Sequence, residues 1–273
     1  MSISSWTERI GNELLDLVYP PGLYCLSCGK ITDASRTYGL CNDCMAAMNW
    51  VDPAHCEKCG RPLSQNDPGR ICFRCSVRES SATPYSFNKG FACAGYGAVE
   101  QSVIFLLKYG SRSDIGDVLG EVLYDRMASE LGADVLAGMY DIVMPVPTHR
   151  EKEKKRGYNH ADLMGRSFAK RAGLSYDPST IRRARATKPM KGLGPGEREA
   201  NIRGAFEIKE WKHGRISGAR VLLIDDIFTT GSTVNEIARI LKEPWKNKDG
   251  QTLPGAARVD FLAFAAAGDM VLS

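Results

Sequence analysis

The sequence predicts an α/β fold with a mainly parallel sheet flanked by helices, preceded by a small cysteine-rich domain. Two observations support this prediction. In the C-terminal two thirds of the chain, short apolar runs alternate with segments of helical periodicity, which is typical of parallel strands joined by helices. In the first third, eight of the nine cysteines form four pairs of identical spacing. The 273 residues are long enough for both parts.

Composition and charge exclude several classes of protein. A hydrophobic fraction of 43% and a charged fraction of 25% are ordinary globular values, which argues against disordered and fibrous chains. No apolar run approaches the roughly 18 residues of a membrane span, and Glu8, Glu13 and Asp16 lie where a secretion signal would be apolar. We therefore expect a cytoplasmic protein. Because residues 1–85 carry a net charge of −1 and residues 86–273 a net charge of +5, anion chemistry is expected in the second part.

Three regions are predicted along the chain. Residues 1–20 form an amphipathic helix, followed by a cysteine-rich domain at residues 21–80 and the α/β domain at residues 86–273. The serine-rich segment 78–88 reads as a linker. The apolar residues at helical spacing in the first region are Ile3, Trp6, Ile10, Leu14 and Leu17.

The four Cys-x-x-Cys pairs indicate two structural zinc sites. The pairs are Cys25 and Cys28, Cys41 and Cys44, Cys56 and Cys59, and Cys72 and Cys75. Each pair turns two thiolates toward one point, and two pairs complete a tetrahedral shell with bonds of about 2.3 Å. The regular intervals suggest two stacked zinc ribbons. The competing interpretations are a redox dithiol or a disulfide framework, and structural disulfides are rare in reducing compartments.

Sequential pairing of the cysteines is favoured, because each ribbon then closes a short loop at low entropic cost. An interleaved cross-brace is the alternative. Gly29 and Gly60 follow the first and third pairs and relieve the tight backbone under the sulfurs. Such small ribbons need metal for much of their folding free energy. The ninth cysteine, Cys93, lies in an apolar run and is expected to be a buried core residue.

The α/β domain is predicted from its alternating segments. The expected strands are Phe91–Tyr96, Asp141–Val146, Arg220–Ile224 and Val259–Ala265. The expected helices are Val99–Tyr109, Ile115–Leu131 and His160–Ala172. Ligands of such sheets bind beyond the carboxyl ends of the strands, so candidate functional residues are sought there.

One predicted strand leads into the most specific motif of the chain. Two carboxylates, Asp225 and Asp226, follow the strand, and a loop of hydroxyl residues then leads into a helix. The loop consists of Thr229, Thr230, Gly231, Ser232 and Thr233. Its backbone N–H groups, its hydroxyls and the helix dipole suit a phosphate monoester, whereas the carboxylates suit a vicinal diol. Together they describe a ribose 5-phosphate; the alternative is a buried strand followed by an ordinary helix cap.

This stretch resembles the phosphoribosyl pyrophosphate (PRPP) signature of type I phosphoribosyltransferases. With the double Cys-x-x-Cys module and the segments Val146–Arg150 and Arg156–Asn159, the chain is similar to the competence protein F (ComF) family over nearly its whole length. The resemblance implies a type I phosphoribosyltransferase-like domain behind a double zinc ribbon. It also implies that Asp225 and Asp226 hold the ribose hydroxyls, that Thr229–Thr233 hold the 5-phosphate, and that Mg²⁺ accompanies the pyrophosphate.

A second strand end offers a site for the pyrophosphate. The turn of Pro147, Thr148, His149 and Arg150 supplies backbone N–H groups and a guanidinium, and in the resembling enzymes the loop at this position binds pyrophosphate. The basic run Arg150–Arg156 is either a further pyrophosphate contact or a solvated helix start.

The segment 182–203 carries seven basic and two acidic residues around a glycine-rich centre. This composition predicts a mobile lid that brings positive charge over an anionic ligand, and a disordered surface loop is the alternative. By resemblance the segment is the flexible catalytic loop. The residues at family-like positions are Arg183, Arg185, Thr187, Arg198 and Asn201. Met190 stands where relatives commonly have glutamine, so a polar contact is missing there or supplied elsewhere.

The predicted mechanism is displacement at the anomeric carbon of PRPP with loss of magnesium pyrophosphate, assisted by electrostatic stabilisation. The catalytic candidates are Asp225, Asp226, Arg183, Arg185 and Arg198. Three functions remain open: a transferase with an unidentified acceptor, a PRPP-binding regulator without turnover, and an accessory of single-stranded DNA uptake. In the last, the ribbons would dock DNA or DNA-processing proteins.

Overall fold

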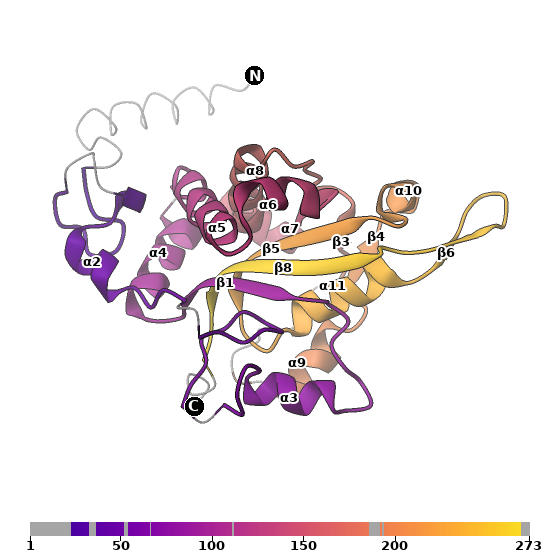
Figure 1. Ribbon diagram of the computed structural model, residues 1–273. Helices are drawn as coiled ribbons and strands as arrows, with labels where there is room; N and C mark the ends of the chain where they lie inside the picture. Colours follow the sequence, from indigo (N-terminus) through magenta and orange to yellow (C-terminus); the bar gives the residue numbers. More distant parts are fainter. Residues whose placement is uncertain are drawn as a thin grey trace, which may run out of the picture.

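The computed structural model is built around a four-stranded sheet of order β1-β8-β5-β2, in which each neighbouring pair of strands is parallel. The structure describes residues 23–32, 37–51, 54–65, 67–110, 112–185, 192 and 194–268. The helix predicted within residues 1–20 lies outside the described residues. The parallel sheet with helices on both sides confirms the predicted α/β fold (Figure 1).

The four strands lie close to their predicted positions, with one informative difference. They are β1 (Gly90–Gly95), β2 (Ile142–Pro145), β5 (Arg220–Phe228) and β8 (Arg258–Ala266). We expected β5 to end at Ile224, but it continues to Phe228 because β8 supplies backbone partners as far as Ala266. On its other side β5 loses its partner earlier, since the last pair with β2 joins Pro145 to Ile224.

Helices cover both faces of the sheet, with α4, α5, α6 and α8 on one side and α9 and α11 on the other (Figure 1). The main helices are α4 (Ala98–Tyr109), α5 (Ile115–Leu131), α6 (Ala133–Met139), α7 (Arg150–Arg156), α8 (His160–Ala172), α9 (Pro195–Ile202) and α11 (Ser232–Lys242). The shorter elements are η1 (Thr37–Gly39), α2 (Asn42–Ala47), α3 (Phe73–Glu79), β3 (Ile181–Arg183), β4 (Phe206–Ile208), η2 (Glu210–Lys212), α10 (His213–Ile216), β6 (Trp245–Lys246) and β7 (Thr252–Leu253). Among the described residues, no helix combines the length and the apolar character that crossing a membrane requires.

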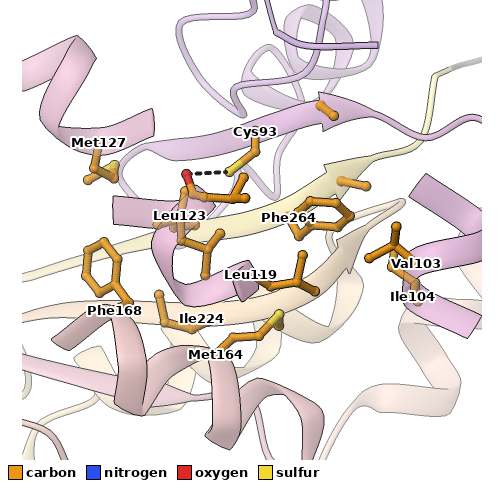
Figure 2. Close-up of a cluster of buried hydrophobic side chains, with 14 of the residues drawn as sticks. Cys93, Val103, Ile104, Leu119, Leu123, Met127, Met164, Phe168, Ile224 and Phe264 are labelled. Atoms are coloured by element: carbon orange, nitrogen blue, oxygen red, sulfur yellow. Dashed lines mark hydrogen bonds between the residues drawn. The ribbon is translucent and has the colours of Figure 1, made fainter. Parts of the chain in front are cut away.

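Alternate side chains of each strand supply two hydrophobic cores, because successive side chains point to opposite faces. On β5, Leu222 and Ile224 join the core under α5 and α8, whereas Leu223 joins the core on the α11 side. Figure 2 shows Cys93 within the first of these cores. Its thiol donates a weak hydrogen bond to the carbonyl of Val122 at 3.8 Å, and burial raises its pKa to about 12. The prediction of a buried core cysteine is confirmed.

The cysteine-rich ribbons lie along the outer edge of β1. Trp50 forms an antiparallel bridge with Ala94, and the N–H of Val51 donates to the carbonyl of Cys93 at 2.9 Å. An uncovered edge strand presents unpaired backbone groups to which other chains can bind. By covering the edge of β1, the ribbons protect it from such pairing. The four cysteines of the second ribbon belong to the hydrophobic core on the α11 side.

The segment predicted as a linker, residues 78–88, is packed against the α/β domain. Phe87 is 1% exposed; its ring stacks on Tyr85 with centroids 4.6 Å apart and meets Phe261 edge-on at 5.0 Å. Residues 80–88 contain no helix or strand, as expected of a connection. Their aromatic residues nevertheless attach the second ribbon firmly to the α11 side of the sheet.

Two equivalent glycines provide a test of this packing. Gly29 and Gly60 both have φ of +72°, but a Cβ at Gly60 would lie 2.6 Å from the Cα of Phe91, whereas at Gly29 it would meet nothing within 4 Å. Gly29→Ala should therefore cost roughly 1 kcal/mol for its left-handed backbone. Gly60→Ala should cost about 1–3 kcal/mol more because of overpacking. Denaturant unfolding of the zinc-loaded proteins would measure both, and equal losses would contradict the packing described here.

Candidate functional site

Each ribbon gathers four cysteine sulfurs around one point. The sulfurs of Cys25, Cys28, Cys41 and Cys44 lie within 4.8 Å of one another, as do those of Cys56, Cys59, Cys72 and Cys75. The sulfurs of Cys28 and Cys41 are 3.7 Å apart, and those of Cys59 and Cys72 are 3.8 Å apart. Tetrahedral zinc with bonds of about 2.3 Å would place its ligands about 3.8 Å apart. Both sets fit zinc, and the sequential pairing is confirmed over the interleaved one.

The two metal centres differ in their surroundings. All four cysteines of the second site are 0–1% exposed, whereas the first site includes the exposed Cys28. In the second ribbon, the N–H of Cys72 also donates to the sulfur of Cys56 at 3.3 Å, which is a favourable contact for a thiolate ligand. The second site is therefore part of the hydrophobic core on the α11 side, whereas the first site is partly open to solvent.

The acidic pair lies at the carboxyl edge of the sheet, beyond the last residue of β2. Asp225 pairs with Ala263 of β8 through its backbone, while its β2 side is open. The N–H of Asp226 donates to the carboxylate of Asp225 at 2.9 Å. Both side chains are partly buried, and Asp225 lines a pocket. The predicted carboxylates thus stand where ligands of parallel sheets bind.

The two carboxyl groups have opposite electrostatic environments. Burial and the neighbouring charge of Asp226 raise the pKa of Asp225 well above its ordinary value. Burial alone would also raise the pKa of Asp226, but an ion pair with Lys108 of α4 outweighs it and lowers that pKa. The ion pair with Lys108 therefore favours the charged form of Asp226, and the sequence analysis did not identify this lysine.

A buried imidazole lies beside this ion pair. His160, at the start of α8, is 4% exposed, and burial lowers its pKa to about 4. The positive charges of Lys108 and Arg156 act in the same direction, while Asp226 opposes them. His160 is therefore neutral at physiological pH and adds no cation to the site.

The hydroxyl loop forms the wall of a small pocket. Gly231 has φ of +80° and is the N-cap of α11, so the helix points its N-terminus at the loop. The hydroxyls of Thr230 and Ser232 are hydrogen-bonded to each other at 2.8 Å. The pocket has a volume of about 50 Å³. It is lined by Arg198, Asp225, Ile227, Phe228, Thr229, Thr230, Gly231, Ser232, Thr233 and Val234.

The predicted lid arginines have different positions. Arg198 of α9 is 7% exposed, lines the pocket, and has no hydrogen-bond partner for its Nε among the described residues. Burial lowers the pKa of Arg183, and the negative charge of Asp225 partly offsets this lowering. Arg185 donates to the carbonyls of Asn201 at 3.1 Å and Arg203 at 2.9 Å, and so holds the end of α9.

Two of the lid residues singled out in the sequence, Thr187 and Met190, lie outside the described residues. β3, at the start of the segment, pairs antiparallel with β4, which follows the segment. The side chains of Arg78 and Glu199 form two hydrogen bonds of 2.8 and 3.0 Å, which attach α9 to α3 of the second ribbon (Figure 1). This ion pair helps to position the helix that carries Arg198.

The predicted pyrophosphate turn is adjacent to the acidic pair. The N–H of Val146 donates to the carbonyl of Ile224 at 2.8 Å, which places Pro147 beside the carboxyl end of β5. The hydroxyl of Thr148 donates to the side chain of Asn159 at 2.9 Å. His149 is the N-cap of α7, the helix formed by the basic run. The structure thus brings three distant motifs to one edge of the sheet.

Sequence reasoning missed three residues at this edge: Lys108, Arg61 and Tyr85. Lys108 lies in the last turn of the amphipathic helix α4, and nothing in that pattern distinguishes a lysine at a carboxylate from one in solvent. Arg61 and Tyr85 donate hydrogen bonds to the carbonyls of Thr229 and Thr230 from the second ribbon and its connection. Only the tertiary packing brings them to the loop.

Comparison with known proteins agrees with both parts of the chain. Residues 14–76 match the double zinc ribbon domain. DNA utilization protein YhgH of Salmonella typhimurium is 28% identical over 81% of this chain and 91% of its own length. Competence protein F of Haemophilus influenzae is 26% identical over 80% and 90%, and competence protein ComFC of Bacillus subtilis is 24% identical over 76% and 79%. The chain is similar to the competence protein F proteins over most of its length.

The resemblance to the competence protein F family is thereby confirmed over most of the chain. Among solved structures, an adenine phosphoribosyltransferase covers 58% of this chain and 72% of its own at 15% identity, with a TM-score of 0.33. The fold described here rests on the strand order and on the two cysteine clusters.

The buried His160 should make the protein sensitive to mild acid. Unfolding lets this imidazole bind a proton at its ordinary pKa of about 6.5, whereas in the folded protein it does so at about 4. The unfolded state then binds more protons as pH falls through this window, so the free energy of unfolding should decrease from about pH 6.5 to 4. His160→Gln should flatten that decrease in denaturant titrations. Parallel pH profiles for the two proteins would contradict it.

Proposed function

We propose that the pocket beyond β5 binds the phosphoribosyl group of PRPP, and that the protein transfers or senses this group. One observation carries the proposal. A hydroxyl loop, a carboxylate and the buried guanidinium of Arg198, whose Nε lacks a partner among the described residues, line the same pocket. A buried N–H group without an acceptor is costly, and an anionic ligand would supply that acceptor.

The two ends of the proposed ligand need different partners: the 5-phosphate needs hydrogen-bond donors, and the ribose hydroxyls need acceptors. The loop and the N-terminus of α11 supply donors for the 5-phosphate, and Arg198 adds a positive charge. Asp225 and Asp226 accept hydrogen bonds from the ribose hydroxyls. Lys108 pairs with Asp226 and so reduces the repulsion between the acidic pair and the phosphate.

The leaving group would lie toward the turn at Pro147, Thr148, His149 and Arg150. As the bond from the anomeric carbon to the pyrophosphate oxygen breaks, positive charge develops on the ribose and negative charge on the pyrophosphate. The turn, with Arg183 near Asp225, supports the second of these charges. Mg²⁺ would enter with the pyrophosphate, whose oxygens are the hard ligands it prefers. Arg185 would act indirectly, by holding α9 in place.

A second candidate function is supported by the relatives. They are named for competence and for DNA utilization. In that function the PRPP site regulates an accessory protein of DNA uptake, and the ribbons dock DNA or DNA-processing proteins. Helix α3 of the second ribbon presents the exposed Phe73 and Val77, which are available to such a partner.

Release of pyrophosphate from PRPP, measured with a panel of bases, amines and nucleotides, separates the two functions. Turnover with one acceptor supports the transferase. PRPP binding without turnover, together with salt-dependent binding of single-stranded DNA, supports the accessory function.

Removal of the acidic pair should abolish PRPP binding. Asp225→Asn with Asp226→Asn keeps the shape of both side chains but removes the charge and half of the acceptor capacity needed for a diol. Calorimetry with PRPP and Mg²⁺ should show no binding, while the zinc content stays at two per chain. The control is Asp141→Asn, which removes a carboxylate paired with Arg220 at the opposite end of the sheet. Normal binding by the double variant would contradict the site.

A further inference from the structure

The second zinc ribbon contacts the hydroxyl loop directly through Arg61. This arginine follows the zinc knuckle, and the residue is 2% exposed. Its guanidinium donates a hydrogen bond to the carbonyl of Thr229 at 2.8 Å and lies over the ring of Phe228, 5.5 Å from its centroid. A buried, charge-assisted hydrogen bond of this kind is among the stronger interactions available to a loop.

A second donor holds the next residue of the loop. The hydroxyl of Tyr85 donates to the carbonyl of Thr230 at 3.1 Å. Tyr85 is fixed in turn by its stacking on Phe87, which meets Phe228 edge-on at 6.3 Å. Two consecutive carbonyls of the loop are therefore bound from the side of the ribbon and its connection.

These bonds determine where the loop directs its donors. The C=O and N–H of a trans peptide point in opposite directions, and the structure has no cis peptides among its described residues. With the carbonyls of Thr229 and Thr230 held toward the ribbon, the N–H groups of Thr230 and Gly231 face away from it. Such oriented N–H groups are the donors that bind phosphate in loops of this kind. Holding them in place before the ligand arrives avoids an entropic cost of binding.

The backbone of Arg61 is part of the knuckle around the metal. The N–H of Cys56 donates to the carbonyl of Arg61 at 2.8 Å, and the N–H of Gly60 donates to the carbonyl of Cys56 at 2.8 Å. Gly60 itself lies so close to β1 that a Cβ at this position would be 2.6 Å from the Cα of Phe91. The position of Arg61 thus depends on the geometry that the four cysteines impose.

We propose that Arg61 is a positioning residue for the phosphate loop, and that zinc in the second ribbon thereby sets the affinity for phosphorylated ligand. This inference rests on the proposed function of the loop. The first ribbon has no such role, because the residue equivalent to Arg61 is Lys30. Its side chain is 67% exposed and pairs with Asp43 at 3.0 Å within the same ribbon.

The first experiment compares Arg61→Gln, Arg61→Lys and the matched control Lys30→Gln. Calorimetry would measure the binding of ribose 5-phosphate and of magnesium pyrophosphate to each zinc-loaded protein. We expect R61Q to bind ribose 5-phosphate roughly tenfold more weakly, which is the size of effect of one charge-assisted hydrogen bond. R61K should recover part of this loss, and K30Q should bind as the wild type does. Pyrophosphate affinity should not change, because the hydrogen bond that R61Q removes is made to the hydroxyl loop, whereas the turn at Pro147 follows a different strand.

Hydrogen exchange provides a readout that needs no ligand. The amides of residues 229–232 should exchange faster in R61Q than in the wild type, while those of β8 should not change. Unchanged exchange in R61Q, or wild-type affinity for ribose 5-phosphate with both zinc ions bound, would overturn the positioning role. Failure of the wild-type protein to bind any phosphorylated sugar would instead contradict the proposed function, so the two failures are distinguishable.

The second experiment removes one metal at a time. Cys28→Ser and Cys59→Ser should each lower the zinc content measured by native mass spectrometry to one per chain. Only C59S should lose affinity for ribose 5-phosphate, and equal losses in both variants would contradict the link to the second ribbon. Should C59S fail to fold, the affinity of R61Q for ribose 5-phosphate with both zinc ions bound decides whether the second ribbon positions the loop.

Discussion

The site depends on a difference in strand length. β5 continues to Phe228 with β8 beside it, while β2 stops at Pro145. Backbone pairing on one side keeps the extended part of β5 rigid, and the missing strand on the other leaves its side chains accessible from the edge. Asp225 and Asp226 occupy this position, half shielded from water, where their interactions with a ligand are stronger than in solvent. The hydroxyl loop and α11 follow β5 directly, and the chain bends at residues 229–231.

Burial of two adjacent carboxyl groups would be unfavourable without compensation. The raised pKa of Asp225 favours its uncharged form, and Lys108 pairs with the carboxylate of Asp226. His160 stays neutral, so α8 can pack its buried face against the sheet without adding a charge to the core. The electrostatics of this edge therefore combine contributions from α4, β5 and α8.

The ribbons are continuous with the rest of the fold. The first covers the edge of β1, and the second contributes its metal centre to the hydrophobic core on the α11 side. The ion pair of Arg78 with Glu199 extends this attachment to α9. The second ribbon thus contacts β1, α9 and the loop after β5, which lines the pocket.

Much of the molecule was predictable because its signals are local. The spacing of eight cysteines determined two tetrathiolate sites, hydrophobic periodicity determined α5 and α8 to the residue, and the acidic pair with its hydroxyl loop identified the candidate site. Each of these depends on neighbours within one segment. The length of β5 was underestimated, because a strand ends where its partners end, and those partners lie far away in the sequence.

Residues whose roles come from distant contacts were decided by the tertiary structure alone. Lys108 reaches Asp226, and Arg61 reaches Thr229 across 168 positions of sequence. The segment predicted as a linker likewise packs through a distant contact, that of Phe87 with Phe261. The sequence by itself determined which chemical groups the protein carries and the elements that present them. Only the folded chain decided which groups meet, because the burial that pairs a charge or orients a loop is a property of surfaces assembled from remote segments.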